Sequence, residues 1–385
     1  MKKRLVSILF SVTIVFLLLP NMHFSAFAEG NGAFEVNAKS AVLMDSESGE
    51  VLYAKNADEA LPPASVTKIM TLLLVMEAVD SDIISLDDMV TVSENAASMG
   101  GSQVYLEPGE EMTVEEMLKC VVVSSANDAA VALAEKIGGS EASFVQLMNE
   151  KAKELGMNNT NFENTTGLDD NTVNHNISAY DIALMSKELI TKHPKILDYT
   201  TIWMDTIRGG TFGLSNTNRL IRFYNGATGL KTGSTSKAGF CISATAKRDD
   251  MHLIAVIMGA ETRDVRNSAA ASLLDWGFAN YSQYMAECGV TDEVKVTGGV
   301  KSCVKGEYEA FSKLMTRGMD KNTKQIIELY DSVSAPVKKG DVIGKVKYIC
   351  NGETVGEVPV LAAETVERIN FWGIIIMFFR NYCLM

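Results

Sequence analysis

The sequence is poor in cationic side chains relative to acidic ones. Its 385 residues carry 35 Lys and Arg against 48 Asp and Glu, a net charge of −13. Such a chain lacks the cationic surface that releases counterions from a phosphate backbone, so we expect no nucleic-acid binding. Apolar residues make up 47% of the chain and charged residues 22%, which is enough apolar material for a large core, and the length suits two domains.

The sequence also lacks closely spaced cysteines. None of the six forms a Cys-x-x-Cys pair, so we expect no zinc site or other metal centre. Cys120 lies in an apolar helical run and Cys241 in an apolar strand, and both are expected to be core residues. A disulfide between Cys303 and Cys350 is compatible with the sequence but not required by it.

Histidine is scarce as well. After residue 28 only His175, His193 and His252 remain, and no Gly-x-Ser-x-Gly motif is present. A Ser-His-Asp triad is therefore not expected. His193 lies in a polar turn and His252 in a β-hairpin, whereas His175 follows a polar loop that could approach a cleft.

Residues 1–28 have the layout of a secretory signal peptide. Lys2, Lys3 and Arg4 precede an uncharged apolar run at 5–19, and Ala26-Phe27-Ala28 supplies small residues two apart. We expect cleavage after Ala28, export and work outside the cytoplasm; the alternative is an uncleaved membrane anchor.

Residues 29–283 are predicted to form a sheet backed by helices, since a strand pair, a helical insert, further strands and a final helix follow one another. The predicted elements are a hairpin at 38–55, a buried helix at 66–79, mostly helical chain at 80–195, a second hairpin made of strands 240–246 and 251–259, and a helix at 267–281.

Residues 286–362 are predicted to form a small all-β domain. The stretch 307–332 is compatible with a helix or with two strands. The clearer elements are strands at 294–304, 342–350 and 355–361, with a hairpin turn at Asn351-Gly352.

The tail, 363–385, carries an apolar and aromatic run at 371–379 between Arg368 and Arg380. This run is too short to span a bilayer. We favour an amphipathic helix in the membrane interface, because the run ends the chain and carries aromatics suited to that depth. The alternative is a terminal helix docked on the β domain.

The first candidate for chemistry is Ser65-Val66-Thr67-Lys68. It follows Pro62-Pro63-Ala64, where a helix can begin because proline is tolerated there. On a helix, Ser65 and Lys68 share a face, and a buried lysine near the positive helix end could be the base that a serine nucleophile needs. Taken alone, the motif is better explained by a helix cap and a solvated lysine.

Two further motifs are polar. Ser125-Ala126-Asn127 could relay a proton and hold a substrate backbone, or it could be a simple turn or cap. Lys231-Thr232-Gly233-Ser234 puts a lysine and two hydroxyls on a strand edge, which suits a substrate ending in a carboxylate. Gly233 would let a peptide lie alongside; the alternative is a glycine bend that opens a hairpin.

In this order the three motifs are a specific signature. The chain resembles penicillin-binding proteins and class A β-lactamases, and most closely the low-molecular-mass serine-type D-alanyl-D-alanine carboxypeptidases. The longer matches are 62–71, 125–130 and 229–233, within a likeness that covers about 36–282. The resemblance implies a β-lactamase/transpeptidase-like fold of the α/β (α+β) class, with an antiparallel sheet, a helical subdomain and a small C-terminal all-β domain.

The resemblance also implies roles. Ser65 would attack the D-Ala–D-Ala carbonyl and become the acyl-ester, Lys68 would take its proton, and Ser125 would pass a proton to the departing D-alanine. The substrate-binding residues would be Asn127 for the substrate backbone, Lys231 for substrate and for polarising Ser125, Thr232, Gly233 and Ser234 on the strand, and Arg266 facing the terminal carboxylate. The N–H groups of Ser65 and Ser234 would form the oxyanion hole.

The partners implied are a peptidoglycan stem peptide ending in D-Ala-D-Ala, β-lactam antibiotics, which would acylate Ser65, and the outer face of the cytoplasmic membrane; no metal or organic cofactor is implied. A β-lactamase is one rival, but no catalytic glutamate is evident between Asn127 and Lys231, and Glu163 lies in a carboxypeptidase-like loop. A crosslink endopeptidase is poorly separated by sequence, and a silent penicillin-binding sensor is disfavoured by the intact motifs.

Overall fold

The computed structural model describes residues 35–170 and 172–375, so the expected signal peptide and the end of the tail lie outside the described residues. A five-stranded sheet in the order β2-β1-β9-β8-β7 organises the first part of the chain, and every neighbouring pair in it is antiparallel. Its strands are β1 (Ser40–Asp45), β2 (Val51–Lys55), β7 (Ala227–Thr235), β8 (Gly239–Arg248) and β9 (Met251–Ala260). Both expected hairpins are present.

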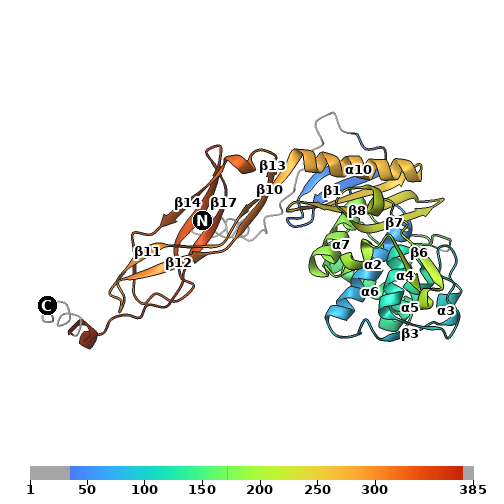
Figure 1. Ribbon diagram of the computed structural model, residues 1–385, viewed down its shortest axis with the longest axis horizontal. Coiled ribbons are helices and arrows are strands. Elements are labelled where there is room, and N and C mark those ends of the chain that lie inside the picture. Colours follow the sequence, from blue (N-terminus) through green and yellow to red (C-terminus); the bar gives the residue numbers. More distant parts are fainter. Residues whose placement is uncertain (1–34, 171, 376–385) are drawn as a thin grey trace, which may run out of the picture.

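Helices cover both faces of this sheet (Figure 1). Alternate residues of β1 and β9 enter two separate cores, as the two-residue period of a strand requires. Val42 and Val256 pack with the helical insert, whereas Leu43 and Ala255 pack with α10 (Arg263–Asn280). The sheet therefore holds the helical insert and the final helix in one body.

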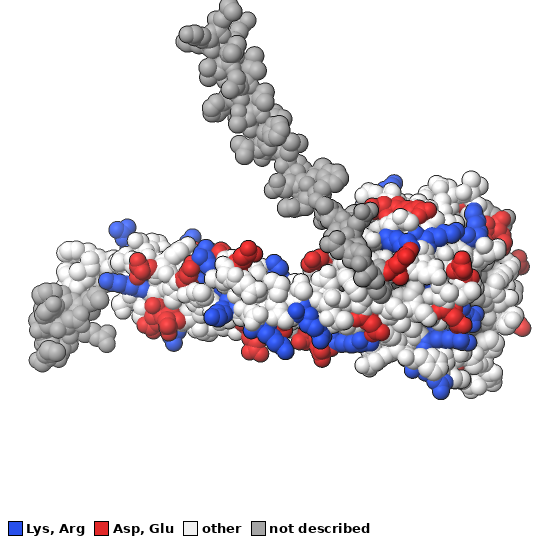
Figure 2. Space-filling view, turned by 90° about the horizontal axis from the view of Figure 1, so that it is seen from above, with Lys and Arg blue, Asp and Glu red and all other residues white. Residues whose placement is uncertain are grey.

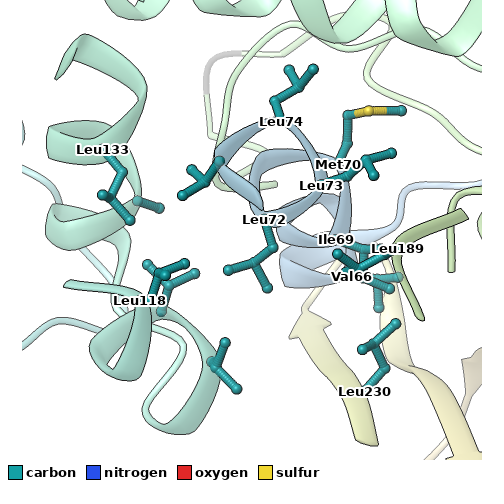
Figure 3. Packing of buried hydrophobic residues seen from close by; sticks show 14 of the residues in the cluster. Val66, Ile69, Met70, Leu72, Leu73, Leu74, Leu118, Leu133, Leu189 and Leu230 are labelled. Atoms are coloured by element: carbon teal, nitrogen blue, oxygen red, sulfur yellow. The ribbon is translucent and has the colours of Figure 1, made fainter. Parts of the chain in front are cut away.

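The helical insert is built around α2 (Lys68–Asp80), which follows the 3-10 turn η1 (Ala64–Thr67). Most of α2 is buried on every side, as in a helix that runs through a core. Figure 3 shows side chains of neighbouring elements around it, among them Leu118, Leu133 and Leu189. The other helices are α3 (Glu94–Ala97), α4 (Val114–Val123), α5 (Asn127–Gly138), α6 (Glu141–Glu154), α7 (Ala179–Lys192), α8 (Ile196–Thr200) and α9 (Leu220–Phe223).

Strands dominate after α10, and a six-stranded sheet forms in the order β14-β16-β17-β12-β11-β15. Its strands are β11 (Gly289–Thr297), β12 (Cys303–Tyr308), β14 (Thr323–Leu329), β15 (Ser332–Ser334), β16 (Val342–Cys350) and β17 (Glu353–Ala362). A separate strand pair consists of β10 (Tyr281–Ala286), which follows directly from α10, and β13 (Phe311–Thr316). Small paired strands also occur in the first part: β3 (Met89–Thr91) with β4 (Glu111–Thr113), and β5 (Met204–Ile207) with β6 (Phe212–Ser215).

Three elements predicted for this region can be compared with the structure, while the exact domain boundaries stay predictions. The single strand expected at 294–304 is wrong, because the chain turns after Thr297 and returns as β12. Gly298, with φ +71°, begins that turn. The stretch 307–332 contains strands, β13 and β14, rather than a long helix. The hairpin turn at Asn351-Gly352 is confirmed between β16 and β17.

The described cysteines are all free thiols, so the disulfide considered for Cys303 and Cys350 is not formed. The Cys303 thiol lies 2.8 Å from a Glu293 carboxylate oxygen, and the Cys350 thiol donates to a backbone carbonyl. Cys120 and Cys241 are fully buried, as expected of core residues.

The described start of the tail is helical at 371–375 and exposes its apolar side chains. Phe371 is 70% and Trp372 71% exposed. No helix within 35–170 or 172–375 is long and apolar enough to cross a membrane.

One loop packs so tightly on η1 that its glycine has no room for a side chain. A Cβ on Gly167 would lie 1.8 Å from the Ala64 carbonyl oxygen, and the glycine has φ +81°. Gly156 has a similar φ, +73°, but open space around it. Substitutions at the two glycines therefore distinguish the cost of backbone strain, which both would have, from that of steric conflict, which only Gly167 would have.

We expect Gly167→Ala to lower the free energy of unfolding by about 3 kcal/mol or more, because strain and overpacking add. Gly156→Ala should lower it by only about 1 kcal/mol, from the positive φ alone. Denaturant unfolding of both variants measures the difference. Equal losses would contradict the packing described here.

Candidate functional site

Ser65 and Lys68 meet as expected, although the helix begins as a 3-10 turn rather than as an α-helix. Ser65 lies within η1, and Lys68 is the first residue of α2. The Lys68 Nζ donates to the Ser65 Oγ at 2.9 Å and to the Thr166 carbonyl oxygen at 2.9 Å. The two contacts hold the amine against the hydroxyl.

Lys68 is fully buried, and its pKa is lowered well below its ordinary value. Burial is the main cause, the nearby cation of Lys231 adds to it, and the Asp128 carboxylate opposes both. Asp128 is itself held by the N–H groups of Val104 and Leu106. A neutral amine beside a serine hydroxyl can act as a general base.

Ser125 is brought into the same cavity as Ser65. It lies between α4 and α5, is 4% exposed, and has φ 60°, a left-handed conformation that is unusual for serine. Such strained backbone tends to persist where the surrounding structure fixes a functional geometry. Ser125 is therefore well placed to exchange a proton with a group bound next to Ser65.

Asn127 opens α5 and does not line the cavity itself. Its Nδ2 donates to the Gly100 carbonyl at 2.6 Å, whereas its buried Oδ1 has no hydrogen-bond partner within the described chain. A buried acceptor without a partner is costly. The amide is thus oriented by protein and keeps one acceptor free.

The third motif lies on β7, the edge strand beside η1. Lys231 is buried, its Nζ donates to the Thr232 carbonyl at 3.0 Å, and burial followed by the Arg266 charge lowers its pKa to about 7. The Thr232 hydroxyl donates to Thr217 at 2.8 Å, and both hydroxyl residues of the motif, Thr232 and Ser234, line the cavity.

The structure shows a steric reason for a glycine at position 233 that the sequence did not suggest. A Cβ there would lie 2.7 Å from the Ser65 backbone nitrogen and 2.9 Å from the Pro63 carbonyl oxygen. Its missing side chain therefore lets β7 approach η1. This contact brings the Ser65 N–H close to the strand that carries Ser234. Gly233 also lines the cavity, so the expected room for a peptide stays a prediction.

Arg266 lies on α10 and lines the cavity, although it is only 3% exposed. Its guanidinium donates to the Asn267 side-chain oxygen at 2.9 and 3.1 Å and to the Cys241 carbonyl at 3.5 Å. Burial, then the charge of Arg263, lowers the pKa of Arg266 to about 10. It stays a cation at neutral pH.

The cavity that joins these residues has a volume of about 580 Å³. Sequence reasoning missed several of its lining residues, which lie outside the three motifs: Ser102, Trp203, Thr217, Arg219, Phe223 and Arg263. The polar run Asn216-Thr217-Asn218 was the available signal. The Asn216 amide binds the Ile202 carbonyl, and the Asn218 amide binds the Gly229 carbonyl on β7.

His175 lies close to the site but is not part of a triad. Its Nδ1 accepts from the Glu163 N–H at 3.0 Å, so its Nε2 carries the proton and donates to the Thr67 hydroxyl at 2.8 Å. Burial lowers the pKa of His175 to about 4, so the ring is neutral. It ties the 163–168 loop to η1.

The other two histidines lie elsewhere. His193 pairs with Asp80, and His252 contacts Thr228 on the sheet. Within the described ranges, no group of three or more His, Cys, Asp or Glu side chains is arranged to hold a metal ion.

Comparison with known proteins agrees with this geometry. The family model described as D-alanyl-D-alanine carboxypeptidase matches residues 26–262, and the model of the penicillin-binding protein 5 C-terminal domain matches 290–368. The D-alanyl-D-alanine carboxypeptidase DacF of Bacillus subtilis is 45% identical over 374 residues, which cover 94% of this chain and 95% of the relative.

Solved structures show the same fold. Penicillin-binding protein 5 of Haemophilus influenzae has a TM-score of 0.74 at 33% identity, over 88% of this chain and 100% of that one. Penicillin-binding protein D2 of Listeria monocytogenes, solved with ampicillin bound, has a TM-score of 0.59 at 33% identity, over 64% of this chain and 99% of that one. The fold class expected from the motifs is confirmed. The chain belongs to the D-alanyl-D-alanine carboxypeptidase family of low-molecular-mass penicillin-binding proteins.

Proposed function

We propose that this carboxypeptidase removes the terminal D-alanine from peptidoglycan stem peptides through an acyl-ester on Ser65. The observation that carries the proposal is the contact between the buried Lys68 amine and the Ser65 hydroxyl at 2.9 Å. An amine that burial and a second cation keep neutral can take the hydroxyl proton.

The first step forms the bond between the Ser65 Oγ and the carbonyl carbon of the penultimate D-alanine. The hydroxyl proton moves to Lys68, and the carbonyl electrons move onto oxygen. The backbone N–H groups of Ser65 and Ser234 would stabilise that oxyanion, a term commonly worth about 3 to 4 kcal/mol per donor. The close approach of β7 to η1 at Gly233 supports this pairing.

The second step breaks the peptide bond. The nitrogen of the departing D-alanine needs a proton, and Ser125 in the same cavity would pass it on. Lys231, which is also buried, would polarise that hydroxyl, and Lys68 would return to Ser125 the proton that it took from Ser65. A water molecule would then attack the ester carbonyl and release the shortened peptide with Ser65 regenerated.

Substrate binding uses both ends of the scissile dipeptide. The terminal carboxylate would meet Thr232, Ser234 and Arg266, which line one side of the cavity. Asn127 would hydrogen-bond the substrate backbone, and for this its unpartnered Oδ1, which is buried next to the cavity wall, would have to turn toward the cavity. This hydrogen bond would give the buried acceptor a partner only when the substrate is bound.

Penicillins would acylate Ser65 by the same route, and the ampicillin-bound Listeria relative supports this. Hydrolysis of that adduct should be slow, since no Asp or Glu lines the described cavity to activate water. Glu163, the one carboxylate considered for that task, instead accepts the N–H groups of Val173 and Asn174 in its own loop. This arrangement disfavours the β-lactamase alternative.

The decisive assay follows free D-alanine released from diacyl-L-Lys-D-Ala-D-Ala by the protein lacking residues 1–28. We expect release by the wild type and a loss of about 10⁴-fold or more in Ser65→Ala, as for removal of a catalytic nucleophile. Mass spectrometry should show a covalent penicillin adduct on the wild type alone.

Ser46→Ala is the control, since Ser46 is a serine of the β1–β2 turn that does not line the cavity. It should retain both activities. Rapid turnover of penicillin without D-alanine release would instead establish a β-lactamase, and an adduct on Ser65→Ala would exclude Ser65 as the nucleophile.

The acylation rate should fall at low pH, because Lys68 accepts the serine proton only when its amine is neutral. The Lys231 charge lowers the Lys68 pKa, and Lys231 with a pKa of about 7 carries that charge across the acidic range. Lys231→Met should therefore move the acidic limb to higher pH, by about one unit. Lys231→Arg keeps the charge and should keep the limb in place.

Penicillin acylation rates measured from pH 4 to 9 by stopped flow provide this profile. A lower rate in Lys231→Met with an unshifted midpoint would mean that Lys231 does not tune Lys68.

We further propose that the protein is exported and attaches to the outer face of the cytoplasmic membrane through its tail. Exposed Phe371, Trp372 and Ile374 in the helical segment support this, since aromatic and aliphatic side chains suit the interface. Cell-wall substrates lie in the same compartment.

Vesicles containing phosphatidylglycerol should bind the mature chain, and Phe371→Ser with Trp372→Ser should reduce partitioning by about tenfold. Met285→Ser with Val290→Ser, two other exposed apolar residues, is the matched control and should bind normally. Unchanged partitioning of the tail variant in sedimentation assays would exclude these residues as the anchor.

A further inference from the structure

The cavity next to Ser65 concentrates positive charge. Acidic and basic side chains are interspersed on the face of the molecule shown in Figure 2, and the whole chain carries −13. By contrast, Arg219, Arg263 and Arg266 line the cavity, and no described Asp or Glu does. A cleft with charge of one sign attracts anionic ligands.

The side chains of two of these arginines form no hydrogen bond or ion pair with other described residues. The Arg266 guanidinium is bound to Asn267 and to a backbone carbonyl, as described above. Arg219, just before α9, and Arg263, at the start of α10, are exposed, and neither side chain has a hydrogen bond or ion pair with a described residue. Their donors are free to bind a ligand.

The position of Arg263 and Arg266 is unfavourable without such a ligand. Both lie in the first turn of α10, where the helix dipole is positive and acidic residues are preferred. Asp264, the one acid in that turn, lines a different surface cavity beside Glu35. Arg263 and Arg219 both act to lower the Arg266 pKa, so the three charges repel one another.

One carboxylate does not account for this site. The terminal D-alanine carries a single carboxylate, for which Thr232, Ser234 and Arg266 already supply donors. We propose that Arg219 and Arg263 form a second anion subsite, which selects substrates whose departing residue carries a side-chain carboxylate besides its terminal one. This inference rests on the proposed function, since it places the departing residue next to Arg266.

The test compares three peptides, diacyl-L-Lys-D-Ala-D-X, in which X is D-Ala, D-Glu or D-Gln. D-Gln matches D-Glu in size but lacks its charge. We expect the wild type to show a kcat/KM about tenfold higher for D-Glu than for D-Gln, mainly through KM, as one or two charge-assisted hydrogen bonds at a partly exposed site would give. Arg219→Gln with Arg263→Gln should reduce this ratio to about one.

Arg222→Gln is the matched control, because Arg222 is a neighbouring arginine that stacks on Trp203 and Phe223 without lining the cavity. It should keep the wild-type ratio. The inference is overturned if the wild type does not prefer D-Glu, if the double variant keeps the preference, or if the double variant loses activity on all three peptides alike, which indicates long-range steering only. Failure of the wild type to release D-alanine from the D-Ala peptide would instead reject the proposed function.

Discussion

The burial of the Lys68 amine is the constraint on which the site depends. Removing an ammonium group from water is so unfavourable that the group loses its proton instead, and the second buried lysine, Lys231, favours the same outcome. The Asp128 carboxylate opposes this loss, but it already accepts hydrogen bonds from backbone N–H groups. The fold therefore keeps the Lys68 amine neutral because it places no described carboxylate in an ion pair with it. Burying an amine in this way lowers the free energy of unfolding.

The same constraint explains why η1 is enclosed by glycines. Gly167 touches the Ala64 carbonyl from the loop side, and Gly233 touches the Ser65 nitrogen from the β7 side. A side chain at either position would separate η1 from its neighbours and admit water to the Lys68 amine. The Thr166 carbonyl, which accepts from Lys68, is held within this same tight packing. The η1 turn is thus positioned by contacts from two segments that are distant from it in sequence.

The three motifs could be predicted from the sequence because each is contiguous and uses residue types with a definite chemistry. Ser65 and Lys68 share a helical face by spacing alone. Their enclosure was not predictable in the same way, because Thr217 and Arg219 enter the cavity from a segment that has no helical or strand periodicity. The contact of Gly233 with η1 was not predictable for a related reason, since η1 is remote from it in sequence. The single strand predicted at 294–304 was wrong because the run is rich in β-forming residues throughout, and glycine was the signal for the turn between β11 and β12.

The charges of the cavity separate the two parts of the reaction. Lys68 and Lys231 are buried and have lowered pKa values, which suits both to proton transfer. The arginines stay charged at neutral pH, so they can only bind and orient. Under the proposed function the arginines would hold the substrate carboxylate. An anion next to the Lys68 amine would instead raise the Lys68 pKa and remove the base. Substrate recognition and base activation would therefore be compatible if residues of α10 and β7 hold the anion away from the Lys68 amine.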